Sequence, residues 1–186
     1  MCQQLSIPDE FVYHFALFLM QRKEDGDFVI VRKLQDFESP YISQKSSIGT
    51  LKLVIRKASW APEIDEALFD HKSTLNLLYV QTIAEVERGW IQVSNETQSQ
   101  LAQMQARGDK KEYMETASRL PLYGYLHFPT SVCDYPMSNT PAQIIVGNRE
   151  LIMRVRTASG EVKEGSFKVR RHRCTGCLAL GDNRSG

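Results

Sequence analysis

Residues 75–89 read Leu-Asn-Leu-Leu-Tyr-Val-Gln-Thr-Ile-Ala-Glu-Val-Glu-Arg-Gly. Apolar side chains and one threonine recur here at positions i, i+3, i+4, i+7, i+8 and i+11, which is the spacing of one helix face. These positions are Leu75, Leu78, Tyr79, Thr82, Ile83 and Val86. The pattern predicts an amphipathic helix that ends at Gly89, because glycine readily adopts the left-handed conformation found at helix ends.

Further helices are predicted on both sides of this one. Pro62 suits the first position of a helix, Ser94 can cap another, and Asp109 with Glu112 resembles the capping box of a third. The side chains expected to face inward are Ile64, Leu68, Phe69, Leu101, Met104, Tyr113, Met114, Ala117 and Leu120. Four short helices with short connections predict a small antiparallel bundle over residues 58–121.

The segment before the bundle, residues 1–57, is predicted to form β-strands. Two apolar runs, at 15–20 and 28–31, are joined through Asp25-Gly26, which is a hairpin signal. A third strand is predicted where Leu51, Leu53 and Ile55 alternate with other residues. Its opposite face is predicted to be the more polar one, since that face carries Lys52, Val54 and Arg56.

The segment after the bundle, residues 122–174, returns to strand character. Short β-rich runs at 142–146 and 151–155 are separated by the turn signal Gly147-Asn148. Residues 175–186 show no periodicity, and we expect a disordered tail there. The order of strands, helices and strands predicts the α+β class.

The composition is that of an ordinary globular protein. The 186 residues include 23 Lys and Arg, 22 Asp and Glu and 42% hydrophobic residues, with a net charge of +1. This balance excludes a polycationic tail protein and an acidic solvating one. The longest wholly apolar run has six residues, whereas a membrane-spanning helix needs about 20. We therefore expect no membrane span, no secretory signal and reduced cysteines.

No catalytic motif is recognisable, and we expect a protein that is not an enzyme. The sequence contains no G-x-S-x-G elbow, no G-x-x-x-x-G-K loop and no H-E-x-x-H, and its four histidines are scattered. No catalytic residue and no cofactor are assigned. His172, Cys174 and Cys177 supply three possible zinc ligands, but a structural zinc site needs a fourth. A zinc-binding module therefore stays open only as a minor alternative.

The stretch 154–173 is basic, with Arg154, Arg156, Lys163, Lys168, Arg170, Arg171 and Arg173. Such a stretch can form a nucleic-acid or anionic-lipid surface. Charged side chains also protect the edges of sheets. We favour edge protection and expect no nucleic-acid partner, because no aromatic residues are interleaved to stack on bases.

Four strings carry a resemblance to a known family. They are Leu-Leu-Tyr-Val-Gln-Thr-Ile-Ala-Glu-Val-Glu-Arg-Gly-Trp-Ile at 77–91, Val-Arg-Lys-Leu-Gln-Asp-Phe-Glu at 31–38, Tyr-Gly-Tyr-Leu at 123–126 and Glu-Gly-Ser-Phe-Lys-Val at 164–169. Together they resemble the FERM-like region of the PX-FERM sorting nexins over residues 7–174. Within that family they resemble the sorting nexin-31 branch more than the sorting nexin-17 branch.

The resemblance implies a FERM-like fold of three lobes. Residues 1–57 would form a partial ubiquitin-like lobe, 58–121 a small helical bundle and 122–174 a partial PTB-like lobe, with a divergent tail at 175–186. It also implies a function, since these sorting nexins are endosomal cargo adaptors that recycle transmembrane receptors. They bind Asn-Pro-x-Tyr motifs in cytoplasmic receptor tails, which add a strand to the edge of the third-lobe sheet.

The sequence departs from that family at both ends. The family begins with a PX domain that binds phosphoinositide membranes, and its third lobe continues into further strands and a helix that forms one wall of the peptide groove. We expect this chain to be a truncated form without these parts. Its expected location is cytoplasmic, with weak attachment to early endosomes or a diffuse distribution.

Few peptide contacts are expected to remain in such a form. Arg171, Arg173 and Cys174 would lie on the remnant of the docking strand, and Thr175 stands where a near relative has a tryptophan that packs on the peptide. We therefore expect affinity for Asn-Pro-x-Tyr peptides to be lost or much weaker. A cytoskeletal linker of the ezrin type shares the lobe order and is the alternative binding protein.

Overall fold

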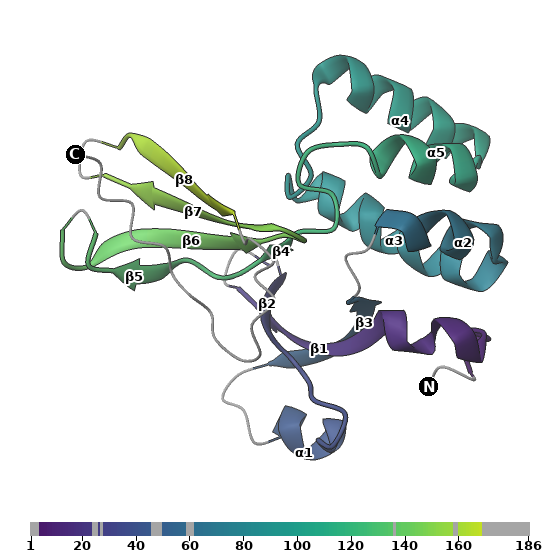
Figure 1. The fold of residues 1–186 in the computed structure, drawn as a ribbon, viewed down its shortest axis with the longest axis horizontal. Helices are drawn as coiled ribbons and strands as arrows, with labels where there is room; N and C mark the ends of the chain where they lie inside the picture. The colour runs from purple at the N-terminus through teal and green to yellow at the C-terminus, as the bar shows by residue number, and fades with distance from the viewer. Residues whose placement is uncertain are drawn as a thin grey trace.

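The computed structural model describes residues 4–23, 26, 28–45, 50–58, 62–135, 137–157 and 160–168. Two antiparallel sheets and a group of helices meet in the middle of the molecule (Figure 1). Most of the helices lie at the right of that view, the C-terminal sheet at the left, and the N-terminal sheet below. The expected α+β class is confirmed. No helix among the described residues is both long enough and apolar enough to cross a bilayer.

The N-terminal sheet has three strands in the order β2-β1-β3. The elements of this part of the chain are η1 (Asp9–His14), β1 (Phe15–Arg22), β2 (Phe28–Lys33), α1 (Pro40–Lys45) and β3 (Leu51–Lys57). Strands β1 and β2 pair in an antiparallel ladder, and β3 pairs antiparallel with the other side of β1. The predicted hairpin and third strand are therefore confirmed.

The central strand β1 is apolar on both faces. On one face, Leu19 belongs to a buried cluster with Leu51. On the other face, Phe18 and Met20 pack in a cluster that includes Trp90, which follows the helices in sequence. The N-terminal sheet is therefore covered on both sides, and one cover comes from later elements of the chain.

The more polar face predicted for β3 carries Arg56, which is buried at the C-terminal end of the strand, as is Lys57 on the other face. Arg56 is only 3% exposed, and Lys57 is 8% exposed. Both cations are paired with carboxylates from the helices, Arg56 with Glu85 and Lys57 with Asp65. Sequence alternation tells which residues share a face, but it does not tell whether acidic side chains from elsewhere cover that face.

The helical part begins with η2 and contains four α-helices: η2 (Pro62–Ile64), α2 (Asp65–Asp70), α3 (Lys72–Glu87), α4 (Asn95–Arg107) and α5 (Lys110–Ala117). The predicted starts of α4 and α5 and the predicted end of α3 are confirmed. The Ser94 hydroxyl accepts a hydrogen bond from the Thr97 N–H at 3.2 Å, and the Asp109 carboxylate accepts one from the Glu112 N–H at 3.2 Å. Gly89 has φ 68°, the left-handed conformation predicted after α3.

The core of the helical part is shared with the start of the chain. Its buried residues are Leu68, Phe69, Leu78, Tyr79, Leu101, Tyr113, Met114 and Ala117, together with Ile7 and Phe15 from the N-terminal region. The rings of Tyr79 and Tyr113 meet edge to face, with centroids 5.1 Å apart. Phe15 is the first residue of β1, so the core of the helical part extends into the N-terminal sheet.

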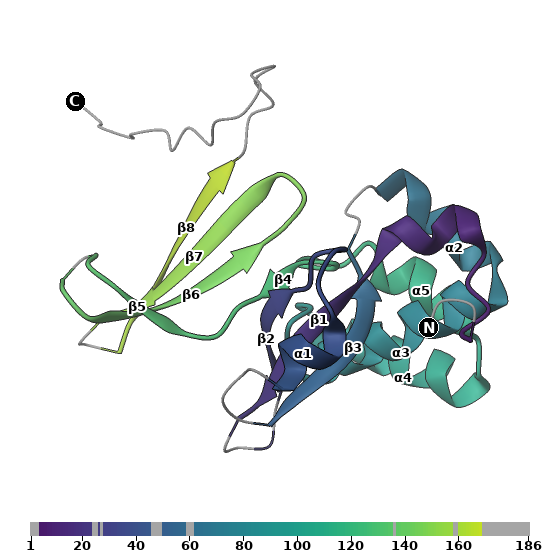
Figure 2. The same cartoon turned by 90° about the horizontal axis from the view of Figure 1, so that it is seen from below.

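The C-terminal sheet has the strand order β4-β6-β7-β8, and β5 also pairs with β6. Its strands are β4 (Leu126–His127), β5 (Ser131–Cys133), β6 (Thr140–Val146), β7 (Glu150–Arg156) and β8 (Val162–Lys168). The predicted turn at Gly147-Asn148 joins β6 to β7 and is confirmed. Figure 2 shows β8 as the outer strand of this sheet, far from the helices.

Candidate functional site

The residues predicted to contact a peptide follow β8 in the sequence. Arg171, Arg173 and Cys174 lie outside the described residues, as do His172, Cys177 and the whole of the predicted tail. In the part of the chain that the structure describes, no three His, Cys, Asp or Glu side chains are grouped to hold a metal ion. The structural site to consider is therefore the strand that leads into these residues.

Among the described residues, strand β8 is paired along one edge only. It pairs with β7 along its whole length, from Val162 opposite Arg156 to Lys168 opposite Glu150. No other strand within the described residues pairs with β8. The N–H and C=O groups of this outer edge are therefore available for main-chain hydrogen bonds.

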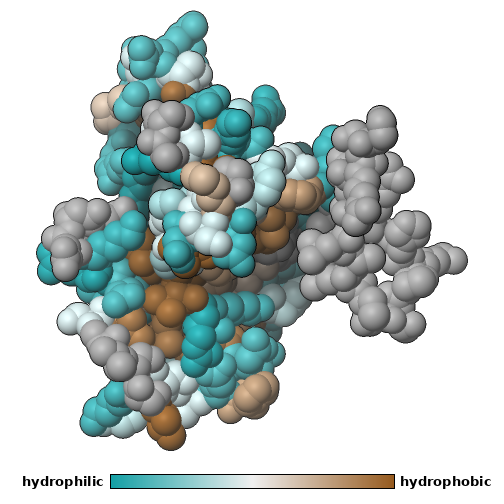
Figure 3. Space-filling model, turned by 90° about the vertical axis from the view of Figure 1, so that its left-hand side faces the viewer, coloured by the Kyte–Doolittle hydropathy of each residue, from teal (hydrophilic) through white to brown (hydrophobic). Residues whose placement is uncertain are grey.

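The two faces of β7 and β8 differ in chemistry, since directly opposite residues share a face. The apolar face carries Ile144 and Val146 of β6, Leu151, Met153 and Val155 of β7, and Phe167 of β8. Phe167 is 50% exposed and Ile144 is 37% exposed. Figure 3 shows the molecule from the end that holds this sheet, with a hydrophobic area below the middle of the view between hydrophilic side chains.

The charged face lies on the opposite side and carries Glu150 and Arg154 of β7 with Glu164, Ser166 and Lys168 of β8. The Arg154 Nε donates to a Glu164 carboxylate oxygen at 2.6 Å. Lys168 lies opposite Glu150, whereas Lys163 lies on the apolar side, opposite Val155. The described part of the basic stretch is thus divided between two faces and interleaved with acidic residues.

Two hydrogen bonds to one carboxylate link the middle of β8 to the start of the sheet. The Tyr125 hydroxyl donates to one Glu150 carboxylate oxygen at 2.6 Å, and the Ser166 hydroxyl donates to the other at 2.6 Å. These two hydrogen bonds, that from Ser166 first, lower the pKa of Glu150. Burial raises the pKa of Tyr125 to about 12, with the hydrogen bond to Glu150 adding to the rise. Sequence analysis missed this link.

Gly147→Ala is expected to destabilise the protein through the Tyr125 ring. A Cβ atom at position 147 would overlap this ring, and the hydrogen bond to Glu150 holds the ring in place. We expect the free energy of unfolding to fall by about 1–3 kcal/mol, the usual cost of overpacking. Urea unfolding followed by circular dichroism measures the change.

Gly165→Ala is the matched control for this prediction. The nearest atom to a Cβ at position 165 is a Phe167 ring carbon at 3.7 Å, which is ordinary van der Waals contact. We expect a clearly smaller loss for this variant than for Gly147→Ala. Equal losses would show that the Tyr125 ring does not restrict position 147.

The three parts of the fold meet around the indole of Trp90, which is 8% exposed. The His127 ring of β4 stacks on it, with ring centroids 5.1 Å apart and an interplanar angle of 9°. The guanidinium carbon of Arg56, from β3, lies 5.5 Å from the indole centroid, and that of Arg88 lies 5.6 Å from it. Stacking and cation–π contacts thus join both sheets to the end of α3.

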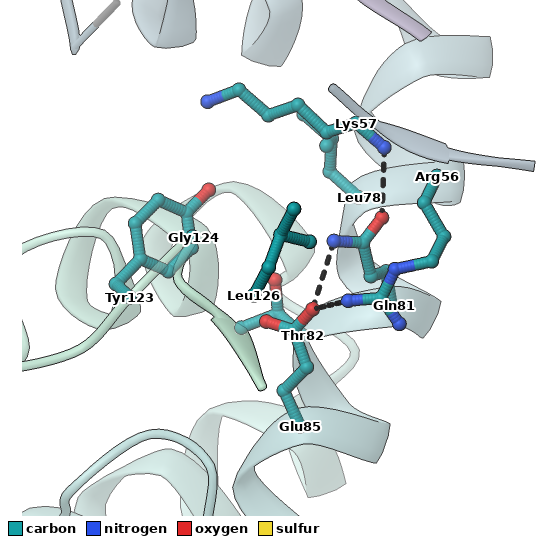
Figure 4. A pocket seen from close by; sticks show the side chains of 9 residues that line it. All are labelled: Arg56, Lys57, Leu78, Gln81, Thr82, Glu85, Tyr123, Gly124 and Leu126. Atoms are coloured by element: carbon teal, nitrogen blue, oxygen red, sulfur yellow. Dashed lines mark hydrogen bonds and ion pairs between the residues drawn. The ribbon is translucent and has the colours of Figure 1, made fainter. Parts of the chain in front are cut away.

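The Arg56 guanidinium that lies over this indole also forms a buried ion pair with Glu85, and Figure 4 shows that pair. The Arg56 Nη2 is 2.5 Å from the Glu85 Oε1, and the side-chain amide of Gln81 donates to the same oxygen at 2.9 Å. The Gln81 carbonyl oxygen accepts from the Lys57 N–H at 3.0 Å. Burial raises the pKa of Glu85, and the neighbouring Arg56 opposes that rise.

The pocket drawn in Figure 4 is too small for a ligand. It lies between β3, α3 and the segment before β4, and its lining includes Arg56, Glu85 and Tyr123. Its volume of about 10 Å³ is at the lower limit for one water molecule. This polar junction is therefore a structural connection between the parts of the fold, and the open edge of β8 remains the candidate binding site.

Three family models match consecutive parts of the chain. The sorting nexin 17/27/31 FERM domain F1 lobe matches residues 1–60, the sorting nexin 17/31 FERM domain F2 lobe matches 61–121, and the sorting nexin 17 FERM C-terminal domain matches 124–185. The chain belongs to the FERM region of the sorting nexin 17/31 family. The expected FERM-like fold is confirmed, with the N-terminal sheet in the F1 match, α2–α5 in the F2 match and β4–β8 in the match to the C-terminal domain.

Individual sorting nexins match the same region. Sorting nexin-17 of Bos taurus is 43% identical over 172 residues, which are 92% of this chain and 37% of that protein. Sorting nexin-31 of Homo sapiens is 32% identical over 173 residues, which are 92% of this chain and 39% of that protein. The chain thus spans well under half the length of these sorting nexins. These two identities are higher for sorting nexin-17 than for sorting nexin-31. The four strings led us to expect a greater resemblance to the sorting nexin-31 branch.

Proposed function

We propose that this chain acts in a cargo adaptor of the sorting nexin type, as a binding protein and not as an enzyme. Its ligand would be an Asn-Pro-x-Tyr motif in the cytoplasmic tail of a transmembrane receptor, and its role would be receptor recycling at early endosomes. The peptide would extend the C-terminal sheet as an added strand. The observation that carries the proposal is the outer edge of β8, which no described strand occupies, in a chain of the sorting nexin FERM family.

Within this proposal, Arg171, Arg173 and Cys174 continue from β8 as the peptide-pairing residues. The described strand supports such a role because the Ser166 hydrogen bond to Glu150 ties β8 to β7. A strand that is already held in place loses less conformational entropy when a peptide binds. The lobe limits that we propose are residues 1–57, 58–121, 122–174 and a tail at 175–186.

Peptide binding tests the proposal. We expect the 186-residue chain, measured alone, to bind an Asn-Pro-x-Tyr peptide at least about ten-fold more weakly than a version extended by the remaining third-lobe strands and helix of sorting nexin-17. Ordering a peptide costs about 1–2 kcal/mol for each residue fixed, and side-chain hot spots supply most of the compensating energy. Thr175, where a near relative has tryptophan, would supply less of this energy. Fluorescence anisotropy with a labelled peptide measures both affinities.

The control is the same peptide with alanine in place of the motif tyrosine, which neither chain should bind. Equal affinities for the two chains would show that the groove does not depend on the added strands and helix. Failure of the extended version to discriminate between the two peptides would contradict the cargo-adaptor proposal itself.

A further inference from the structure

We propose that the outer edge of β8 also pairs with β8 of a second copy of this chain, in an antiparallel arrangement with a two-fold axis at Ser166. An axis perpendicular to the sheet makes the strands antiparallel and keeps each face continuous across the two copies. Ser166 then lies opposite Ser166 of the second copy. The paired residues are 164–168, all of which belong to β8.

The charged face is complementary to itself in this register. Glu164 lies opposite Lys168 of the second copy, and Lys168 lies opposite Glu164 of that copy. Within one copy, Arg154 already lies opposite Glu164 and Glu150 lies opposite Lys168. Four side chains on neighbouring strands therefore form a row with alternating charge. The row runs from Arg154 and Glu164 of one copy to Lys168 and Glu150 of the second copy. Opposite charges on facing strands stabilise a sheet.

The apolar face is also complementary to itself. The side chain of Phe167, which is 50% exposed, faces Gly165 of the second copy across the new ladder. Gly165 lies opposite Met153 on the neighbouring strand and carries no side chain that would meet the incoming ring. Pairing an aromatic side chain with a glycine on the facing strand covers the exposed glycine backbone. The apolar face would thus continue from Leu151 of one copy to Met153 of the other.

Neighbouring registers lack this match. Moving the axis to Gly165 places Glu164 opposite Ser166 and Lys168 opposite Val162. Moving it to Phe167 places Lys168 opposite Ser166 and Glu164 opposite position 170, which lies outside the described residues. A shift by one residue of one strand would set the charged face of one copy against the apolar face of the other. Of these registers, only the one centred on Ser166 forms two ion pairs between residues that the structure describes.

Charge reversal tests this arrangement in the full 186-residue chain. We expect wild-type protein to self-associate in sedimentation equilibrium, and Glu164→Lys and Lys168→Glu each to weaken association by about ten-fold or more, because each brings two pairs of like charges together. An equimolar mixture of the two variants should associate better than either variant alone, since both pairs across the interface are then opposite in charge. Lys163→Glu is the matched control on the same strand and should associate like wild type.

Circular dichroism and thermal unfolding show whether each variant is folded. Recovery of association in the mixture is a second control, because misfolded variants would not associate in this way. The proposal is overturned if wild-type protein stays monomeric at every concentration, or if both single variants associate as wild type does. It is also overturned if the mixture associates no better than either variant alone. An edge that binds only an Asn-Pro-x-Tyr peptide, without self-association, gives the first of these results.

Discussion

Arg56→Met is expected to lower the free energy of unfolding by about 3–5 kcal/mol, the cost of removing one partner from a buried ion pair. Arg56 and Glu85 have side chains only 4% and 3% exposed, and their charged atoms are 2.5 Å apart. Without Arg56, the Glu85 carboxylate must remain charged in an apolar environment or take up a proton. Urea unfolding at neutral pH, compared with wild type, measures the loss.

Two further variants show that the loss comes from the unpaired charge. Adding Glu85→Leu to Arg56→Met removes the second charge, so the double variant should recover much of the stability. Lys111→Met breaks the exposed pair between Lys111 and Asp70, whose side chains are 53% and 64% exposed, and should leave stability nearly unchanged. A double variant as unstable as Arg56→Met alone would assign the loss to packing around Trp90.

Lowering the pH from 6.5 to 4 is expected to destabilise the protein through His127. This histidine is 3% exposed, and burial, with Arg154 and Arg56 nearby, lowers its pKa from 6.5 to about 4 despite a hydrogen bond with the Trp90 backbone. Between these two pH values the unfolded chain binds a proton at this position and the folded protein does not. Stability is therefore complete above pH 6.5 and falls as the pH decreases, by about 3 kcal/mol in total below pH 4.

His127→Phe isolates this contribution, because phenylalanine can stack on Trp90 but takes up no proton. The pH dependence of its unfolding free energy should be flatter than that of wild type between pH 6.5 and 4. Some dependence should remain from His14, whose pKa is also lowered by burial. His71→Gln, which replaces an exposed histidine away from Trp90, is the matched control for the substitution. The same slope in His127→Phe and wild type would contradict the assignment.

The local structure of this chain could be predicted because it depends on neighbouring residues. The periodicity of Leu78 and its neighbours predicted α3, and Ser94 and Asp109 marked helix starts that the structure confirms. Arg56 and Lys57 could not be placed in this way. Their burial depends on carboxylates 29 and 8 residues further along the chain, and strand alternation carries no information about such partners.

The candidate site was predictable only in part. The resemblance led to the C-terminal sheet, and β8 is the strand that precedes Arg171, Arg173 and Cys174, whose roles stay predictions. The hydrogen bonds of Glu150 to Tyr125 and Ser166 span 25 and 16 residues and have no signature in spacing or composition. Such links follow from strand register, which becomes visible only when the whole sheet is assembled.

The two adjacent cations at the end of β3 have a consequence for synthesis on the ribosome. Arg56 and Lys57 leave the exit tunnel before the helices that supply their partners, and Glu85 follows Arg56 by 29 residues. At about 5–20 residues per second, translation leaves Arg56 without this partner for roughly 1–6 s. During that interval burial of the guanidinium is unfavourable, so the nascent N-terminal sheet should remain incompletely packed until α3 emerges. The final packing of the N-terminal sheet is thereby coupled to the emergence of the helices from the ribosome.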